Sequence, residues 1–248
     1  EYRNSTDGFY GWTTIREAIQ HSFNITAVKT AQDIGINLCY EYAQRFGFST
    51  LCNDDKTLGL PLGGLTNGVT NLELTAGYAT IANQGEYIEP SFYTAVYDHS
   101  GNLILDNTSQ ERHVAISKET AFLLTDAMRD VMTVGTGTGA YFGSTMDQAG
   151  KSGTTTSNRD ILFAGFTPYY TCVVWGGTTA IHPMSIVLAP APPKRPDRGI
   201  NLGNLFCLRI CQENLFPSVP EIPCSITDLL GATNFMPGIS ILCHDATS

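Results

Sequence analysis

The sequence predicts an α/β fold in which helices flank an antiparallel sheet. Helical periodicity dominates up to about residue 134, whereas after residue 146 three short apolar or β-branched stretches follow one another closely. Strands joined by so few residues pair as antiparallel neighbours. The chain has 248 residues, of which 42% are hydrophobic, so it can bury a sizeable core.

The first three predicted helices occupy residues 14 to 46. One begins at Thr14 and runs to Gln20. In the next, apolar residues recur every third position until Gly35, at Ile25, Val28, Ala31 and Ile34. A further helical stretch continues to about Phe46.

Two more helices and a hairpin complete the region before the sheet. Thr70 and Glu73 form a capping box, which predicts a helix that ends with Gly85 as its C-terminal cap. Residues 92–106 predict a hairpin around the turn 98–101. Ser117 caps a helix that ends before the glycine-rich run 134–139, and strands are predicted at 146–153, 161–167 and 171–176.

Charge and composition exclude several functions. The 14 basic and 23 acidic residues give a net charge of −9, so we predict no nucleic-acid partner, because phosphate binding needs clustered Lys and Arg. The seven cysteines include only one closely spaced pair, and no histidine lies at metal-ligand spacing from it, so we predict no metal site and no cofactor. The chain opens at Glu1 without an initiator Met or signal peptide, so we interpret it as a piece of a longer protein.

The first chemical candidate is Lys151-Ser152-Gly153-Thr154, on a predicted strand. The ammonium and hydroxyls can hold a carboxylate, and Gly153 lets a ligand lie close to the strand. The alternative is a solvated strand end.

The second candidate is Ser22 with Asn24, at a helix-to-helix junction. If the loop is extended, both side chains can face one cavity. Alternatively, either residue serves as the N-cap of the helix that we expect to begin at Ile25.

Three other features favour structural interpretations. Gly135-Thr136-Gly137 follows a helix and precedes a strand, which is the reverse of the order in phosphate-binding loops. His21 beside Ser22 is expected to face solvent or to pack, rather than form a catalytic pair. Asp126 and Asp130 are expected to lie on a solvated helix surface.

Residues 2–177 resemble the transpeptidase domain of class A, bifunctional penicillin-binding proteins. Ser-x-Asn and Lys-Ser-Gly-Thr match two of the signatures of penicillin-binding proteins and serine β-lactamases. The matching segments occur in family order at 14–18, 22–24, 27–29, 77–85, 135–137, 149–155, 160, 163–168 and 175–177.

The resemblance implies a peptidoglycan D,D-transpeptidase of the penicillin-recognising, β-lactamase-like fold, present here in incomplete form. Ser22 and Lys151 are then catalytic: Ser22 relays protons and Lys151 sets the electrostatics of the cleft. Asn24, Ser152, Gly153 and Thr154 bind substrate, and the Thr154 N–H is an oxyanion donor. The implied ligands are a stem peptide ending in D-Ala-D-Ala and β-lactam antibiotics.

The family nucleophile lies in Ser-x-x-Lys, and no such tetrad occurs in these 248 residues. Thr26 and Lys29 have the spacing, but we interpret them as structural. The resemblance places the nucleophile upstream, so we expect this chain alone to be inactive. Two alternatives stay open: an inactive domain that binds a peptide or a partner, and a D,D-carboxypeptidase or serine β-lactamase of the same fold.

The prediction divides the chain at residue 177. Only three of the twelve prolines precede residue 178, and residues 178–248 form a proline-rich tail that does not match the family. A one-base shift of the reading frame would restore a family-like Tyr-Asp turn, so we interpret the tail as frameshifted.

The resemblance further implies a parent fused to a glycosyltransferase, anchored at the extracytoplasmic face of the bacterial membrane near the cell-wall synthesis machinery.

Overall fold

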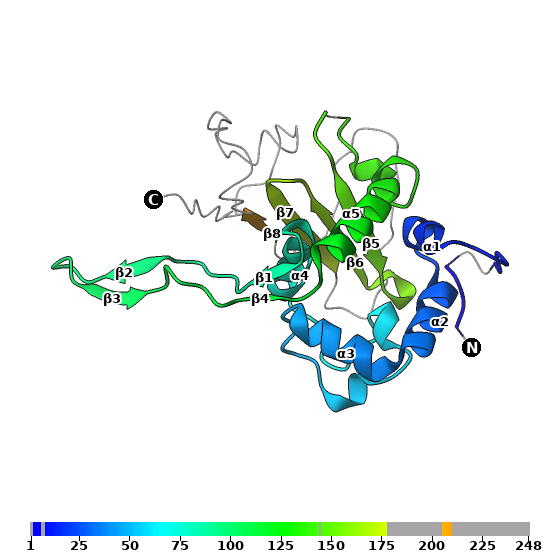
Figure 1. The fold of residues 1–248 in the computed structure, drawn as a ribbon, viewed down its shortest axis with the longest axis horizontal. Helices are drawn as coiled ribbons and strands as arrows, with labels where there is room; N and C mark the ends of the chain where they lie inside the picture. Colours follow the sequence, from blue (N-terminus) through cyan, green and yellow to red (C-terminus); the bar gives the residue numbers. More distant parts are fainter. Residues whose placement is uncertain (1, 6–7, 144, 178–204, 210–248) are drawn as a thin grey trace, which may run out of the picture.

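The computed structural model describes residues 2–5, 8–143, 145–177 and 205–209. Figure 1 shows a body of helices and sheet from which one long hairpin projects. Within the described part of the chain, no helix combines the length and apolar character needed to cross a membrane.

The central sheet has four antiparallel strands in the order β5-β6-β7-β8. These are β5 (Ala149–Thr154), β6 (Asp160–Phe166), β7 (Tyr170–Gly177) and β8 (Leu205–Arg209). The three strands predicted before residue 177 are confirmed with small shifts of their ends. In the predicted tail, only β8 is described, and it pairs with β7. The domain boundary at 177 and the frameshift stay predictions.

The first three helices are α1 (Ile15–His21), α2 (Asn24–Ile34) and α3 (Ile36–Arg45), as the periodicity predicts. Thr14 and Glu17 form a capping box at the start of α1. Gly35 separates α2 from α3 with a φ of 93°, a backbone conformation that favours glycine.

The start of α2 differs from both capping alternatives. The helix begins at Asn24, and its N-cap residue Phe23 makes no side-chain capping bond. Instead, the buried Asn4 accepts from the Ile25 N–H at 3.1 Å and donates to the Gly8 carbonyl at 2.7 Å. A side chain 21 positions earlier therefore satisfies a donor that neither Ser22 nor Asn24 satisfies.

Helix α4 (Asn71–Ala82) begins with the predicted capping box, in which the Thr70 hydroxyl accepts from the Glu73 N–H. Its end is corrected: Asn83 is the C-cap and Gln84 adopts the left-handed conformation. Gly85 comes next, and its N–H donates to the Thr80 carbonyl at 2.8 Å. This is a Schellman closure in which Gln84 is the first residue after the C-cap, and Gly85, whose φ of 89° is also positive, follows it.

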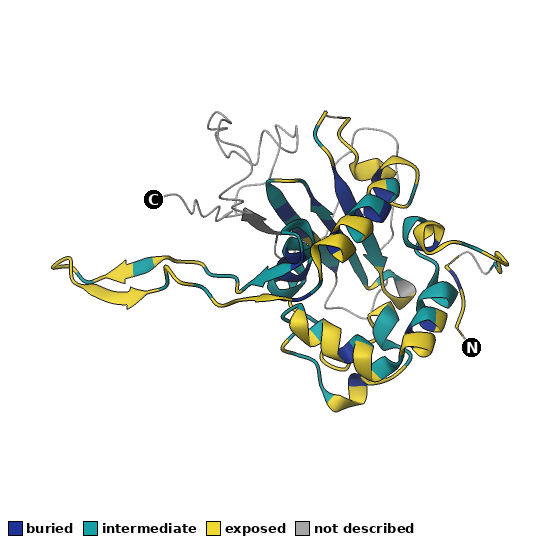
Figure 2. Ribbon diagram, in the orientation of Figure 1, coloured by how far each residue is buried: buried dark blue, intermediate teal, exposed yellow. Residues whose placement is uncertain are grey.

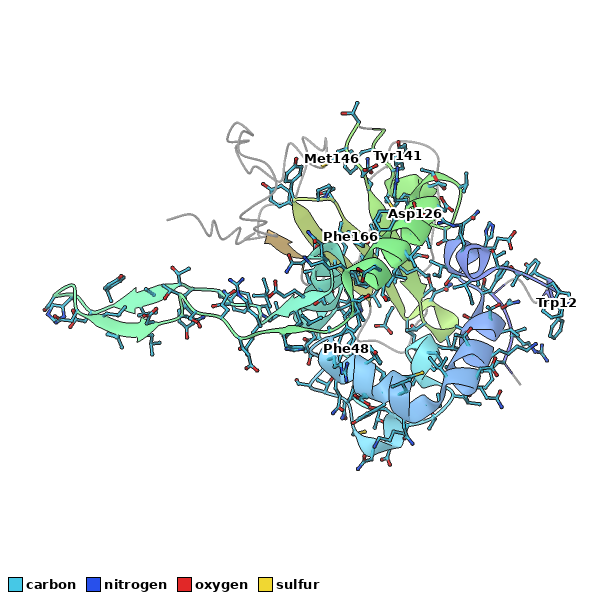
Figure 3. The ribbon with its side chains drawn as sticks, in the orientation of Figure 1. Trp12, Phe48, Asp126, Tyr141, Met146 and Phe166 are labelled. Atoms are coloured by element: carbon cyan, nitrogen blue, oxygen red, sulfur yellow. The ribbon has the colours of Figure 1, made fainter. Side chains whose placement is uncertain are left out.

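Helix α5 (Lys118–Thr133), capped by Ser117, packs with α4 against the sheet. Met128 of α5 meets Ala149 and Phe166 in a buried cluster. Figure 2 shows the buried residues concentrated where α4, α5 and the sheet meet, and Phe166 is labelled there in Figure 3. Burial of this face fixes β5 relative to the helices.

Asp126 and Asp130 lie on a partly exposed helix surface, as expected, but an arginine that the sequence did not point to pairs with them. Arg16 of α1 forms ion pairs with both carboxylates, with Asp126 and, at 2.9 Å, with Asp130. Asp126 is labelled on α5 in Figure 3. The spacing that places both carboxylates on one helical face also lets one arginine from another helix bind both.

The predicted hairpin is confirmed as β2 (Ala95–Tyr97) paired with β3 (Leu103–Asp106). Asp98 holds its turn by accepting from the Ser100 and Asn102 N–H groups. The hairpin projects from a second pair, β1 (Glu86–Ile88) and β4 (Arg112–Val114), which sequence analysis does not predict. Short 3₁₀ helices complete the described chain: η1 (Asn53–Asp55), η2 (Leu60–Leu62), η3 (Thr138–Ala140) and η4 (Thr156–Asn158).

Candidate active site

The two sequence candidates meet at one hydrogen bond. Lys151 Nζ donates to Ser22 Oγ at 2.7 Å, across 129 positions of the chain. A second Lys151 N–H donates to the Ser152 carbonyl at 2.9 Å. An ammonium carries three protons, so one donor direction remains for another acceptor.

Ser22 occupies its position because it ends α1 in a left-handed conformation, with φ 58° and ψ 48°. The loop is therefore not extended, so the condition under which both Ser22 and Asn24 would face one cavity is not met. A non-glycine residue in this region costs about 1–2 kcal/mol. The Phe23 N–H donates to the Ala18 carbonyl at 2.9 Å and closes the turn.

Lys151 occupies its position because of the strand register. It lies opposite Ala164 in the β5–β6 ladder. Ala149, Gly150 and Ala164 are small and buried around it, and its long side chain reaches the Ser22 hydroxyl. Burial lowers the pKa of Lys151 from 10.5 to about 8, because a low-dielectric surrounding disfavours the charged amine.

The chemistry of this pair follows from its geometry. An amine whose pKa is near neutrality exchanges protons readily with a partner at hydrogen-bond distance. Ser22 and Lys151 can therefore pass a proton between them. Among the described residues, no group of three or more His, Cys, Asp or Glu side chains could hold a metal ion.

Ser152, the next residue of β5, has a hydroxyl partner that sequence analysis does not assign to the site. Thr136 Oγ1 lies 2.7 Å from Ser152 Oγ. Thr136 belongs to the Gly-Thr-Gly loop that follows α5, a segment that matches the family but to which the sequence analysis gave no role in the site. The available signal was two glycines flanking a hydroxyl residue, a pattern typical of a tightly packed loop.

The other predicted site residues, Asn24, Gly153 and Thr154, differ in burial and in the residues they contact. Asn24 is half-buried, and its side-chain amide donates to the Arg3 carbonyl at 2.8 Å. This hydrogen bond directs the amide to the N-terminal segment and not to Lys151. Gly153 is half-buried opposite Leu162, and Thr154 is exposed opposite Ile161. A Cβ at Gly153 would touch Leu162 only at 3.5 Å, which is ordinary contact.

The turn after Thr154 is fixed by Asp160. Its carboxylate accepts from the Thr155 hydroxyl at 2.9 Å and from the Trp175 indole N–H at 3.0 Å. Its own backbone N–H donates to the Thr155 hydroxyl at 2.8 Å. These bonds join β5, β6 and β7 at the end of the strand that carries Lys151.

His21 has the packing role predicted for it. The residue is exposed, and its ring stacks on Phe23 with the centroids 5.6 Å apart. Phe23 also stacks on Tyr10 at 4.4 Å.

An antiparallel sheet covered by helices, with a Ser–Lys pair between a helix end and the edge of that sheet, defines the class of penicillin-recognising transpeptidase folds. The family model described as "Penicillin binding protein transpeptidase domain" matches residues 2–175. The chain belongs to this family.

Known relatives agree with that assignment. The chain is 37% identical over 177 residues to penicillin-binding protein 1A of Clostridium botulinum, covering 71% of this chain and 21% of that protein. It is 35% identical over 182 residues to penicillin-binding protein 1F of Bacillus subtilis, covering 71% and 24%. The chain thus spans about a fifth to a quarter of these relatives' length.

The fold is shared with solved structures. The penicillin-binding protein PonA1 of Mycobacterium tuberculosis matches with a TM-score of 0.65 and 25% identity, over 73% of this chain and 52% of that chain. Penicillin-binding protein 1A of Haemophilus influenzae matches with a TM-score of 0.57 and 25% identity, over 66% and 30%.

Proposed function

We propose that this chain forms part of a peptidoglycan D,D-transpeptidase and supplies two walls of its active site. The observation that carries the proposal is the 2.7 Å hydrogen bond from Lys151 Nζ to Ser22 Oγ. It joins the two signature motifs of the family, which lie on a helix end and on a strand. A chance pair of solvated polar residues would not place a largely buried amine on a serine hydroxyl.

The reaction assigns a separate task to each residue. A nucleophilic serine, which we place upstream of this chain, attacks the carbonyl of the penultimate D-alanine. The C–N bond breaks, and terminal D-alanine leaves as an amine after receiving a proton through Ser22. Lys151 stabilises the proton network. An amine of a neighbouring stem peptide then attacks the acyl-serine and releases the serine.

Substrate binding falls to the rest of β5 and to Asn24. The hydroxyls of Ser152 and Thr154 bind the terminal carboxylate, and the Thr154 N–H donates to the oxyanion. The fold leaves ordinary room beside Gly153, so packing does not explain its glycine, whereas close approach of a ligand does. The Asn24 amide binds the substrate amide after it releases the Arg3 carbonyl.

The proposed reaction also indicates which ligands the site binds and which kind of protein this chain is part of. PonA1 has been solved in complex with penicillin V, and a β-lactam presents a carboxylate and a strained amide to a site of this kind. For the parent we propose a class A enzyme with a glycosyltransferase domain. We place it at the extracytoplasmic face of the membrane, where it binds D-Ala-D-Ala stem peptides and works with the cell-wall synthesis machinery.

Labelling with a fluorescent penicillin tests the proposal. The 248-residue chain should form no covalent adduct, because it has no Ser-x-x-Lys tetrad. A protein extended by the upstream coding segment should be labelled, and Lys151→Ala in that protein should reduce the labelling rate at least about a hundredfold. Lys118→Ala, at the exposed start of α5, is the matched control and should label normally.

Two results would contradict the proposal. A stable adduct on the 248-residue chain would show that the nucleophile lies within it. Unchanged labelling of the extended Lys151→Ala protein would remove Lys151 from the mechanism. Release of labelled D-alanine without any cross-linked product would instead identify a carboxypeptidase, and stable folding without labelling would identify an inactive binding domain.

A further inference from the structure

The loop between α5 and β5 brings a second hydroxyl to the proposed carboxylate site. Thr136 Oγ1 lies 2.7 Å from Ser152 Oγ; Thr136 is exposed and Ser152 is half-buried. We infer that Thr136 is a positioning residue that holds the Ser152 hydroxyl in the direction required by a ligand carboxylate. This inference rests on the proposed function, because it assigns Ser152 a carboxylate ligand.

The direction of the hydrogen bond follows from counting protons. A serine hydroxyl has one proton to donate and two lone pairs that accept. If Ser152 donates its proton to a carboxylate, the bond with Thr136 must run from Thr136 to Ser152. Accepting that bond also strengthens the Ser152 O–H as a donor, because hydrogen bonds in a chain polarise one another.

Ser152 needs such a restraint because of its residue type. The signature of penicillin-recognising enzymes is written Lys-Thr-Gly, whereas this chain has Lys151-Ser152-Gly153. Threonine is β-branched and stiff at χ1, but serine rotates among its staggered positions. Thr136 therefore supplies from a neighbouring loop a restraint that the serine side chain lacks.

The loop is rigid enough for this task. The Thr136 N–H donates to the Gln20 carbonyl at 3.2 Å, and the Gly137 N–H donates to the Val131 carbonyl at 2.8 Å. A Cβ at Gly135 would overlap the Gln20 carbonyl and lie 2.7 Å from the Val131 Cα, so only glycine fits there. Gln20 lies two residues before Ser22, so the loop ties the Ser152 hydroxyl to the helix end that carries Ser22.

The test measures the preference of the chain for a free carboxylate. The probes are N-acetyl-D-alanyl-D-alanine and its C-terminal amide, titrated into the 248-residue chain and followed by NMR chemical shifts. Thr136→Val removes the hydroxyl and keeps the shape, and should reduce the preference for the carboxylate about tenfold. Thr136→Ser should retain it.

Two further variants separate positioning from a general structural effect. Thr138→Val, an exposed residue of the same loop, should leave the preference unchanged. Ser152→Thr combined with Thr136→Val should restore the preference to within about twofold of the wild type, because the threonine restrains its own hydroxyl. Thr136→Ala is measured beside Thr136→Val, so that one poorly folding variant does not decide the result.

The outcomes distinguish this inference from the proposed function. If the wild type prefers the carboxylate and the Thr136 variants keep that preference, or Ser152→Thr fails to restore it, the inference is overturned and the proposed function stands. If the wild type binds the acid and the amide equally, the carboxylate role of Ser152 fails, and both are overturned.

Discussion

The two walls of the candidate site are held by different kinds of structure. The sheet wall, residues 149–154, lies in a ladder in which six consecutive residues pair with β6. The helix wall, residues 21–24, is a junction between two helices, where Ser22 adopts a left-handed conformation. The sheet wall is fixed by many local bonds, whereas the helix wall depends on a few contacts from distant residues.

This difference teaches how the pair of catalytic candidates is aligned. Lys151 needs only the correct register, because a shift by one residue would turn its side chain to the other face of the sheet. Ser22 depends on α1 being held against α5 and on the loop at Gly135 and Thr136. Changes at the helix wall and at its contacts should therefore show how strongly each wall relies on the other.

The largest effect is expected at Gly135, in the loop after α5 that packs against Gln20, two residues before Ser22. Gly135→Ala would press a Cβ against backbone atoms of Gln20 and Val131 and should lower the free energy of unfolding by about 3 kcal/mol. Urea unfolding would measure it. Gly139→Ala, at a position with open space, is the matched control and should stay within about 0.5 kcal/mol.

The next effect concerns the charge on Lys151. Its pKa is about 8 in the folded chain and 10.5 ordinarily, so the unfolded chain binds this proton more strongly. Stability should therefore rise with pH between about 8 and 10.5, by about 3 kcal/mol relative to Lys151→Met. Below pH 8 the buried charge is fully present. Equal pH profiles for the wild type and Lys151→Met would refute the burial effect.

A smaller effect on stability is expected at Ser22, where the variant that relieves strain also loses the hydroxyl proposed to act in catalysis. Ser22→Gly and Ser22→Ala both remove the hydroxyl that accepts from Lys151, but only glycine also releases the strain of the left-handed conformation, so Ser22→Gly should be about 1 kcal/mol more stable than Ser22→Ala. Ser22→Ala, which loses the hydroxyl but keeps the strain, is the control. Thermal unfolding of both variants would show whether the strain is released only by glycine.

The smallest effect is expected at the ion pairs between α1 and α5. Arg16→Gln breaks the bonds to Asp126 and Asp130, and their side chains are about one third or more exposed. Exposed pairs contribute little, so the loss should be below about 1 kcal/mol and should shrink at high salt. A larger loss that salt does not change would indicate that packing, not charge, joins the two helices.

Much of the fold was predictable where short-range patterns decide it. The capping boxes at Thr14 and Thr70, the hairpin turn at Asp98 and three of the sheet strands follow from neighbouring residues alone. Asn4 capping α2 was not predictable, because the bond joins positions far apart. The pairing of Arg16 with two carboxylates of α5 was missed for the same reason.

The sequence by itself determined the five helices of the described residues, the β2–β3 hairpin, three strands of the sheet and the two motifs with their chemistry, because capping, periodicity and turn preferences act over a few residues. Only the tertiary structure decided that Lys151 contacts Ser22, that Thr136 contacts Ser152, and that Asn24 is bonded to Arg3. These contacts depend on how α1, α5 and β5 pack, since a small shift of a helix against a sheet changes which side chains meet.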